Sequence, residues 1–459
     1  MQIRTKPLLL DDVLVPSRLP RPKRRYLHDP KATMDRNDRR ILTLIIIAGL
    51  SQSFAGSLLV VTLPFWRVAF GLTPEEASGA LALVRIGVLI AILFGIVGDR
   101  FGRRAPLLTS LGLLLIANLG TAFAEDVTMF LILQAVARGA STAVAGLGVI
   151  YLTEELHHGR RGVGLGVLGL ATSVAGGLAY LLAPMFDLGT QYQWLFALSA
   201  LGLLTLPALF KFLHESRAFD INADRFNFAV LVRFRSRLLP LAVAGFLGGA
   251  FTALTTSFVN DFLINTRRWG SLRAGLVIIG AGAIGSFGLL VGGRVADVVG
   301  RKPTAVAGTM LGVVGGISFF FTSGWLIAVG IIVGSFGASM FVPAFQTMRA
   351  ELFPTDVRSS AVSVLMVMSV VGAITSLAIG RIAIAEIGLP LYIGLVGAIT
   401  LLSIPMLLMV PETRDTIIAK PPPGDDAMGS SSQTEESSKE PETTKLRPTP
   451  IPAPGSSAM

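Results

Sequence analysis

The strongest constraint on the fold of this chain is that it carries the same set of motifs twice, about 197 residues apart. An Asp-x-x-Gly-Arg-basic pattern at 99–104 recurs at 297–302. Two further acid–base pairs recur in the same order, namely Glu154 with Arg161 and Glu351 with Arg358, and then Glu215 with Arg217 and Glu412 with Arg414. A period of 20–50 residues would indicate a solenoid, whereas a period this long indicates two homologous halves.

The segments between these motifs are apolar, which places the chain in a membrane. Of its 459 residues, 52% are hydrophobic and only 15% are charged, and the mean hydropathy is +0.67. An ordinary soluble domain carries about 25% charged residues, so this composition argues against a soluble enzyme. The chain has 50 glycines, which let membrane helices approach closely. It has no cysteine, which excludes disulfides and thiolate metal sites.

Twelve apolar stretches are each long enough to cross the hydrocarbon core, which takes about 20 residues of helix. They are predicted at 41–66, 77–97, 106–124, 127–150, 162–184, 192–213, 238–264, 272–294, 303–322, 325–349, 359–384 and 389–410. Six precede a central loop at 214–237, which leaves bundles of equal length at 41–213 and 238–410. The predicted fold is an all-α membrane protein with twelve transmembrane helices in two homologous six-helix bundles, an architecture of secondary transporters.

The distribution of positive charge predicts the orientation, because cytoplasmic loops retain Lys and Arg. Of the 39 basic residues, 32 lie in one set of segments or at the helix ends beside them. This set includes both termini, so we expect the basic tail at 1–40 and the tail at 411–459 in the cytoplasm and the protein in the cell membrane. The net charge of +10 therefore reflects topology in a lipid bilayer, and we expect no nucleic-acid partner. The second tail is rich in Pro, Ser, Thr and Glu and is predicted to be disordered.

The first motif resembles the loop signature of the major facilitator superfamily, Gly-x-x-x-Asp-Arg-x-Gly-Arg-Arg. The matching residues are Gly95, Asp99, Arg100, Gly102, Arg103 and Arg104. The resemblance covers roughly 41–415 and implies a transporter whose two halves rock against each other. It also implies that Asp99, and more weakly Asp297, takes part in a charge network that favours the outward-facing state. The second copy has Val298 in place of Arg100, so its network should be thinner.

The other repeated pairs resemble the sugar-porter and metabolite:proton symporter branch of that superfamily. The resemblance implies that these acid–base sets hold the two halves together as interdomain ion pairs, which is a gating role. The residues assigned to gating are Asp99, Arg100, Arg103, Glu154, Arg161, Asp297, Arg301, Glu351, Arg358, Glu412 and Arg414. Local capping, in which charges offset the helix dipole, is an alternative that can hold at the same time. The central loop is short for a sugar porter, so a sugar is one candidate solute among several.

Ionisable residues inside a membrane cost about 2.5–3.5 kcal/mol each and are functional candidates. None of the 29 carboxylates lies near the middle of a predicted span, and Asp261, in the outer third of span 7, comes closest. This absence argues against a standard proton-symport mechanism and leaves peripheral coupling through Asp261 as the alternative. Arg138 is predicted near the midplane of span 4, and Arg85 in the outer half of span 2.

Polar residues of spans 1, 4, 7 and 10 are the candidates for solute binding, because these spans line the central cavity in the superfamily. The residues assigned to substrate binding are Gln52, Gln134, Arg138, Thr252, Thr256, Asn260, Ser339 and Gln346. Small polar residues also pack membrane helices together, and Arg138 can pair with backbone carbonyls, so both alternatives stay open. An unpaired Arg138 would favour an anionic or strongly hydrogen-bonding solute.

The sequence thus predicts a secondary transporter that moves a small polar solute, such as an organic anion or a sugar-like metabolite, by alternating access. A multidrug or metabolite exporter and a non-transporting membrane sensor are the alternatives. The Gly-Pro-x-x-Gly-Gly motif of drug antiporters is broken by Thr172 and Ser173, which favours uptake. No nucleotide-binding motif occurs, so we expect no ATP-driven pump, no enzyme, no cofactor and no metal. We expect a monomer whose partners are the solute, the bilayer and a proton as coupling ion.

Overall fold

The computed structural model describes residues 36–156, 161–186, 191–216, 232–353 and 355–413. Within these ranges the chain is helical and contains no strand. Twelve helical segments are long and apolar enough to cross a membrane, which confirms the predicted fold class. All the described residues belong to one compact unit, Met1–Asp415. The tail predicted to be disordered lies almost wholly outside the described residues.

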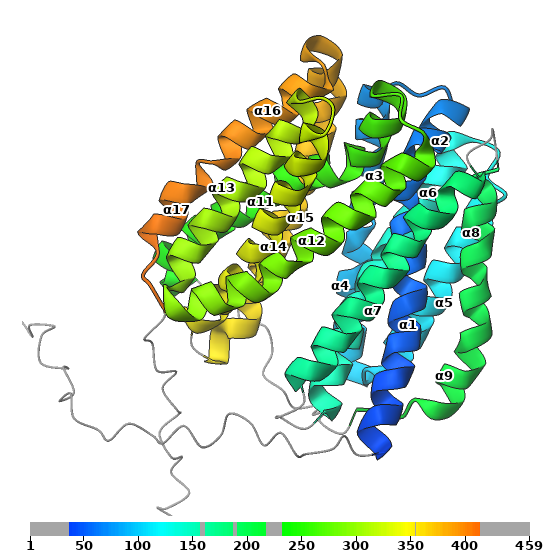
Figure 1. Cartoon of the computed structure of the whole chain (residues 1–459). Coiled ribbons are helices and arrows are strands. Elements are labelled where there is room, and N and C mark those ends of the chain that lie inside the picture. Colours follow the sequence, from blue (N-terminus) through cyan, green and yellow to red (C-terminus); the bar gives the residue numbers. More distant parts are fainter. Residues whose placement is uncertain (1–35, 157–160, 187–190, 217–231, 354, 414–459) are drawn as a thin grey trace, which may run out of the picture. The chain divides into compact units, whose positions relative to one another are not determined.

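We call the helices before the central loop the first half of the molecule. They form the first six spans, and only the short helix α2 lies outside these spans. Figure 1 labels its helices, which are α1 (Arg36–Val61), α2 (Leu63–Ala69), α3 (Pro74–Ile86), α4 (Val88–Phe101), α5 (Arg104–Thr121), α6 (Val127–Glu155), α7 (Arg161–Leu182) with the 3₁₀ segment η2 (Ala183–Phe186), α8 (Gln193–Ser199), the 3₁₀ segment η3 (Ala200–Thr205) and α9 (Leu206–Phe212). Helices α3 and α4 together form span 2, and α8, η3 and α9 form span 6.

The last six spans, which we call the second half, follow the central loop. They consist of α11 (Arg235–Asp261) with the π-helical η5 (Phe262–Thr266), α12 (Ser271–Val298), α13 (Arg301–Phe321), α14 (Leu326–Glu351), α15 (Thr355–Ile387), α16 (Leu389–Thr400) and α17 (Ser403–Met409), and a short 3₁₀ turn, η4 (Val232–Phe234), precedes α11. Each of the twelve predicted ranges falls on one of the twelve spans.

The structure interrupts several spans that the sequence predicted as continuous. Span 2 breaks at Gly87, where a Cβ atom would collide with the backbone carbonyl of Ala135 on α6. Span 6 passes through the 3₁₀ turns of η3, and span 7 ends in a π-helix. Hydropathy reports only that a stretch is apolar, so it cannot show where contact with another helix changes the local winding.

Glycine allows the helices of the second half to touch. Helices α13 and α14 approach so closely that a Cβ on Gly315 would collide with the backbone of Gly334, and one on Gly337 with the backbone of Gly312. Figure 1 shows α13 and α14 within the second half. Close backbone approach of this kind stabilises membrane helix pairs, for which the hydrophobic effect supplies no drive against lipid.

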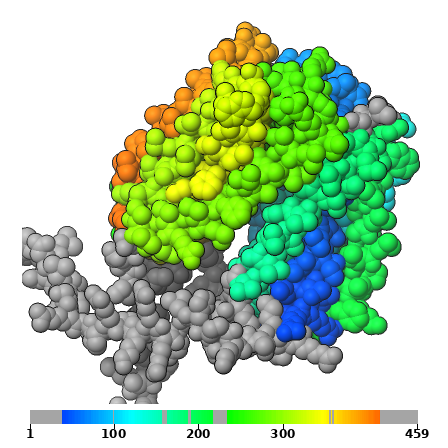
Figure 2. Space-filling model, in the orientation of Figure 1, coloured from blue at the N-terminus to red at the C-terminus, as the bar shows by residue number. Residues whose placement is uncertain are grey.

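The outer surface of the helices is apolar, as contact with lipid requires. On α7, for example, Leu170 and Val174 are exposed over 68% and 63% of their area. Figure 2 shows side chains of α7, together with those of α1 and α9, on the visible surface of the first half. Exposed apolar surface on this scale is rare in a soluble monomer and is expected for a helix in a bilayer.

Candidate functional site

The turn between α4 and α5 is built around a carboxylate that follows α9. Glu215 accepts hydrogen bonds from the backbone N–H groups of Arg103 and Arg104, with 3.2 Å between Arg104 N and Glu215 Oε1. These N–H groups lie at the start of α5, where no helical carbonyl can accept them. Gly102 has a φ of +97°, and a Cβ there would lie 2.5 Å from Glu215 Cδ. The backbone conformation and the adjacent carboxylate therefore both require glycine.

The turn between α12 and α13 has the same construction. Glu412 accepts from the backbone N–H of Arg301 at 2.8 Å and from that of Lys302 at 3.0 Å, at the start of α13. Gly300 has a φ of +134°, and a Cβ there would lie 2.8 Å from Glu412 Oε2. The sequence repeat is thus repeated in geometry, with Glu412 in the place of Glu215.

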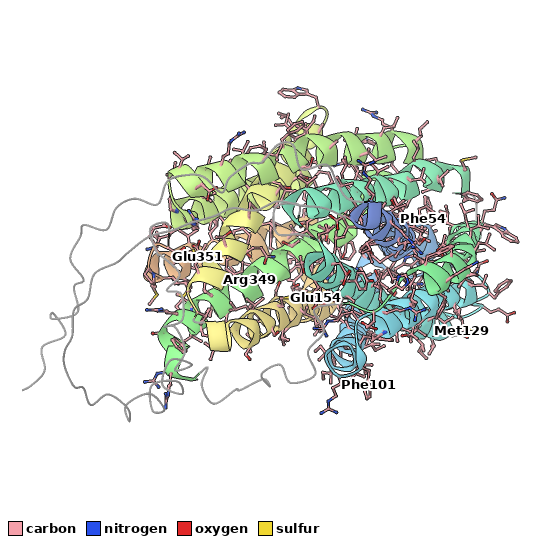
Figure 3. All side chains as sticks on the ribbon, turned by 90° about the horizontal axis from the view of Figure 1, so that it is seen from below. Phe54, Phe101, Met129, Glu154, Arg349 and Glu351 are labelled. Atoms are coloured by element: carbon pink, nitrogen blue, oxygen red, sulfur yellow. The ribbon has the colours of Figure 1, made fainter. Side chains whose placement is uncertain are left out.

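An arginine in each turn also pairs with a carboxylate on a neighbouring helix. In the first half, Arg103 Nε lies 3.3 Å from Glu154 Oε1 on α6. In the second half, Arg301 Nη2 lies 3.3 Å from Glu351 Oε1 on α14 and 3.3 Å from Asp297 Oδ1. Figure 3 labels Glu154 and Glu351 at the ends of their helices.

We call the end of the helices where these groups lie the turn end. The first turn cluster is Gly102, Arg103, Glu154 and Glu215, and the second turn cluster is Gly300, Arg301, Glu351 and Glu412.

Among the described contacts, the acid–base sets pair within each half, and pairing between the halves stays a prediction. Arg103 and Arg301 each reach a carboxylate of their own half, because α6 packs against α5 and α14 against α13. The alternative of local capping is confirmed at Glu215 and Glu412.

The gating role of the remaining residues stays a prediction. Arg100 is exposed, and Asp297 contacts Arg301 through a side chain that is 73% exposed. The side chains of four other residues lie outside the described part of the chain, namely Asp99, Arg161, Arg358 and Arg414.

At the opposite end of the helices, a buried ion pair joins the two halves. Arg67 Nε of α2 donates to Asp261 Oδ1 of α11 at 3.0 Å, and the two side chains are only 11% and 2% exposed. Asn265 adds a hydrogen bond to the same oxygen at 2.7 Å and another to the carbonyl of Pro64 at 3.1 Å. We call the end of the helices that holds the Arg67–Asp261 pair the joined end. The sequence singled out Asp261 for coupling but gave no signal for its partner.

Helices α3 and α15 also pack closely against each other at the joined end. The hydroxyl of Ser78 donates to the carbonyl of Leu377 at 2.8 Å, and a Cβ on Gly380 would collide with Ser78 Oγ. The side chain of Arg381 covers Gly79, whose added Cβ would lie 3.0 Å from Arg381 Cδ. Small residues on both helices therefore bring the halves into direct contact.

Three predicted solute-binding residues lie on α11. Asn260 is buried, and its amide donates to the carbonyl of Val61 at 2.6 Å, so in this structure it joins the halves instead of facing a cavity. Thr252 and Thr256 are exposed, and the Thr256 hydroxyl donates to the Thr252 carbonyl at 2.6 Å. The binding role of the two threonines stays a prediction.

Gln134 belongs to a buried polar network inside the first half. Its amide donates to Asn118 Oδ1 at 3.1 Å and to Thr121 Oγ1 at 2.9 Å, both on α5. Asn118 in turn donates to the carbonyl of Ala55 on α1 at 3.0 Å. Because its amide group donates to two acceptors on α5, Gln134 holds α6 against α5. This is the helix-packing role that the sequence analysis left open for small polar residues.

The remaining predicted residues divide between the two halves. Gln52 Nε2 donates to Ser141 Oγ at 2.9 Å, which links α1 to α6. Ser339 faces α12, where a Cβ on Gly288 would lie 3.0 Å from Ser339 Cβ. Gln346 is exposed and accepts a hydrogen bond from Arg349, a buried arginine labelled in Figure 3 that the sequence analysis did not select.

Among the residues assigned to substrate binding, all of them in the described part of the chain, only Arg138 has a buried polar atom without a hydrogen-bond partner. It is half-buried, and its Nε is a buried donor without a hydrogen-bond partner. A cavity of about 10 Å³ lies beside it, lined by Ala55, Gly56, Leu59, Gln134 and Ala137. A volume of this size holds about one water molecule.

Arg85 lies near Arg138 but was not among the residues that the sequence analysis assigned to substrate binding. It is half-buried, and its Nη2 donates to the buried Ser257 Oγ of α11 at 3.3 Å. Gly87, two residues after Arg85, packs against the backbone of Ala135 and Gly139 on α6, so Arg85 and Arg138 lie on either side of the same helix contact. The sequence showed an arginine within an apolar span, but it could not show how α3 lies relative to α6.

Comparisons with known proteins agree on one family. A sequence model described as Major Facilitator Superfamily matches residues 45–296 and 241–449. The inner membrane transport protein YnfM of Escherichia coli (strain K12) is 30% identical over 226 residues, which are 47% of this chain and 53% of that protein. The aligned part thus spans about half the length of that relative.

Solved structures share the fold at low sequence identity. The crystal structure of a D-xylose–proton symporter gives a TM-score of 0.65 at 19% identity over 82% of this chain and 98% of that chain. The inward open conformation of the xylose transporter XylE from E. coli gives a TM-score of 0.64 at 18% identity over 83% of this chain and 98% of that chain.

Proposed function

The chain belongs to the major facilitator superfamily, and on this premise we propose that it is a secondary transporter, not an enzyme. In this proposal it moves a small polar solute across the cell membrane by alternating access, in which two halves rock about a site between them. The proposed halves are the bundles at 41–213 and 238–410, joined by the loop at 214–237.

The observation that carries the proposal is that the two ends of the halves are held differently. At the joined end, the Arg67–Asp261 pair connects one half to the other. At the turn end, the described ion pairs of Arg103 with Glu154 and of Arg301 with Glu351 lie within one half each. Separation of the halves at the turn end leaves those pairs intact, whereas opening of the joined end breaks the Arg67–Asp261 pair.

We place the turn end in the cytoplasm, because the basic residues of the chain gather in its loops and in both tails. The conformation described here is then closed toward the outside. Opening to the outside requires the buried charges of Arg67 and Asp261 to separate or to be neutralised, since an unpaired buried charge is strongly unfavourable.

Asp261 is the residue we assign to proton coupling. It is buried, it carries the charge that joins the halves, and it lies at the end we place outside. Protonation of Asp261 would remove its attraction for Arg67 and so favour outward opening. The fold shared with a D-xylose–proton symporter keeps proton coupling and a sugar-like metabolite among the candidates.

The solute we favour is an organic anion, because Arg138 is a positive charge inside a span with an unsatisfied donor. Uptake by purified protein in proteoliposomes tests the function, with labelled succinate, lactate and xylose as solutes. Saturable uptake of one of them, absent from empty liposomes, is expected. Absence of flux for a solute that binds the purified protein would contradict transport and favour a sensor.

A reversible cross-link at the joined end tests alternating access separately. The chain has no cysteine, so Ser78→Cys with Gly380→Cys introduces the only thiols, at positions in direct contact. We expect oxidation to stop uptake and reduction to restore it, while each single cysteine variant transports under both conditions. Uptake that continues in fully cross-linked protein would contradict the proposed motion.

A further inference from the structure

Two arginines of the first half lie at the closest approach between two helices. Arg85 comes two residues before Gly87, and Arg138 comes directly before Gly139. A Cβ on Gly87 would collide with the carbonyl of Ala135, and one on Gly139 with the carbonyl of Gly87. Because the backbones touch here, both arginine side chains start from the same small region of the membrane interior.

Neither arginine has a counter-charge within the described part of the chain. No carboxylate forms an ion pair with Arg85 or Arg138, although both lie inside predicted spans. Both arginines lie beside the contact of Gly87 with Ala135 and Gly139, so their positive charges share one small region. A guanidinium group keeps its proton in a protein, so the two positive charges persist. In surroundings of low dielectric constant their repulsion is strong, and a negative charge between them would offset it.

The hydrogen-bonding capacity of the pair is also incompletely used. Arg138 Nε is buried without a partner, and Arg85 donates to the neutral hydroxyl of Ser257 at 3.3 Å, a long contact for a charged donor. One turn along α6 from Arg138, Ser141 accepts from Gln52. The cavity behind Arg138 holds only about 10 Å³, so a solute would have to approach from the exposed side of the two half-buried side chains.

We propose that Arg85 and Arg138 form one binding site for a dianionic solute, such as a dicarboxylate or a phosphate, which supplies the missing negative charges. This inference rests on the proposed transport function and specifies the charge of its solute. The planar forks of the two guanidinium groups suit carboxylate and phosphate oxygens.

The same geometry connects binding to opening. Ser257 belongs to α11 of the second half, whereas Arg85 belongs to the first half, so their hydrogen bond crosses between the halves. A dianion is a stronger acceptor than a hydroxyl and competes for Arg85 Nη2. Binding of the solute therefore removes a contact between the halves near the joined end.

The experiment measures binding of succinate, inorganic phosphate, lactate and xylose to the purified full-length protein by calorimetry, together with uptake in proteoliposomes. We expect succinate or phosphate to bind at least roughly tenfold more tightly than lactate, since charge-assisted hydrogen bonds are each worth about a factor of ten or more. Succinate without phosphate identifies a dicarboxylate, and phosphate without succinate identifies a phosphate solute.

Variants then assign the binding to the two arginines. Arg85→Gln and Arg138→Gln should each weaken dianion binding by roughly tenfold to a hundredfold, and Arg85→Lys and Arg138→Lys by less. The matched control is Arg294→Gln, which removes an exposed arginine from α12. A folded, monodisperse Arg85→Lys variant keeps the test valid if a glutamine variant does not fold.

Three results would overturn the inference. The first is dianion binding that is unchanged in the variants of both arginines, and the second is lactate or xylose binding as tightly as either dianion. The third is xylose uptake that is unchanged in the variants of both arginines, which would refute the dianion site while leaving transport intact. Absence of flux with dianion binding retained would refute transport while leaving the site intact.

Discussion

The two halves of the molecule agree at the turn end and differ inside the membrane. The first and second turn clusters share a glycine with positive φ, an arginine–glutamate pair and a capping glutamate, at positions displaced by 197 or 198 residues. Even the second basic residue of each turn repeats its contact: Arg104 donates to the Phe210 carbonyl and Lys302 to the Leu408 carbonyl.

The membrane interior lacks this repetition. At the positions equivalent to Arg85, the second half has Gly282 or Ala283, depending on the displacement used, and at those equivalent to Arg138 it has Ser335 or Phe336. Gly285, which corresponds to Gly87, still touches α14 at Ser335. The close helix contact is therefore kept in both halves, whereas the charge is present in only one.

The difference indicates which parts of the chain serve which task. A motion of two equivalent bodies needs equivalent turns, so we infer that the repeated clusters stiffen each half as a unit. Recognition of one solute needs no symmetry, and we infer that the unrepeated arginines provide it. This division is tested by substitutions that should have equal effects at the two turns and unequal effects in the interiors of the two halves.

The largest expected effect separates the two interiors. Arg138→Ala should reduce uptake to background, because it removes the charge and the buried donor at the proposed site. Ser335→Ala, at the equivalent position of the second half, should leave uptake within about a factor of two, since it removes one hydroxyl and keeps the Cβ that packs beside Gly285. Initial uptake rates in proteoliposomes with matched protein content give both values. Equal effects of the two substitutions would break the comparison.

A smaller effect is expected at the ion pair that the halves share. Asp261→Asn and Arg67→Gln should each lower proton-driven uptake by roughly tenfold, because each leaves a buried partner unsatisfied. Since the two residues act as one pair, the double variant should lose little more than either single variant. Uptake driven by an imposed proton gradient is the measurement, and additive losses would show that Arg67 and Asp261 act independently.

The smallest expected effect compares the two caps. Glu215→Gln and Glu412→Gln should each lower the melting temperature by about 1–3 °C, since a helix cap contributes about 1 kcal/mol. The two shifts should match, because each carboxylate accepts from two backbone N–H groups in the same geometry. Thermal unfolding in detergent measures them, and a shift confined to one half would contradict equivalent turns.

Much of the fold could be predicted from the sequence, because span length and the repeat are linear features. The twelve spans follow from apolar length, and the pairing of Gly102 with Gly300 follows from the displacement. The capping role of Glu215 and Glu412 was predicted only as an alternative to ion pairs between the halves. Sequence places a charge at a helix end but does not tell whether it turns toward its own half or the other.

The candidate site was less predictable, since it depends on how the helices face each other. Gln134 and Arg138 lie one turn apart on α6, yet Gln134 bonds to α5 while Arg138 Nε has no partner. Asn260 carries the same amide chemistry as a binding residue but donates to Val61 across the halves. Arg85 becomes a candidate only once the contact at Gly87 brings α6 beside it.

The most direct test of the account is a distance between the two turn ends. Phe101 and Val299 are equivalent, exposed residues next to the turn glycines, and spin labels on Phe101→Cys and Val299→Cys are unique in this cysteine-free chain. Pulsed electron paramagnetic resonance should give two distance populations whose ratio changes with solute. In a variant that also carries Ser78→Cys and Gly380→Cys, oxidised to the cross-link before labelling, only the longer one should remain. A single distance that neither solute nor cross-link changes would contradict the rocking of two equivalent halves.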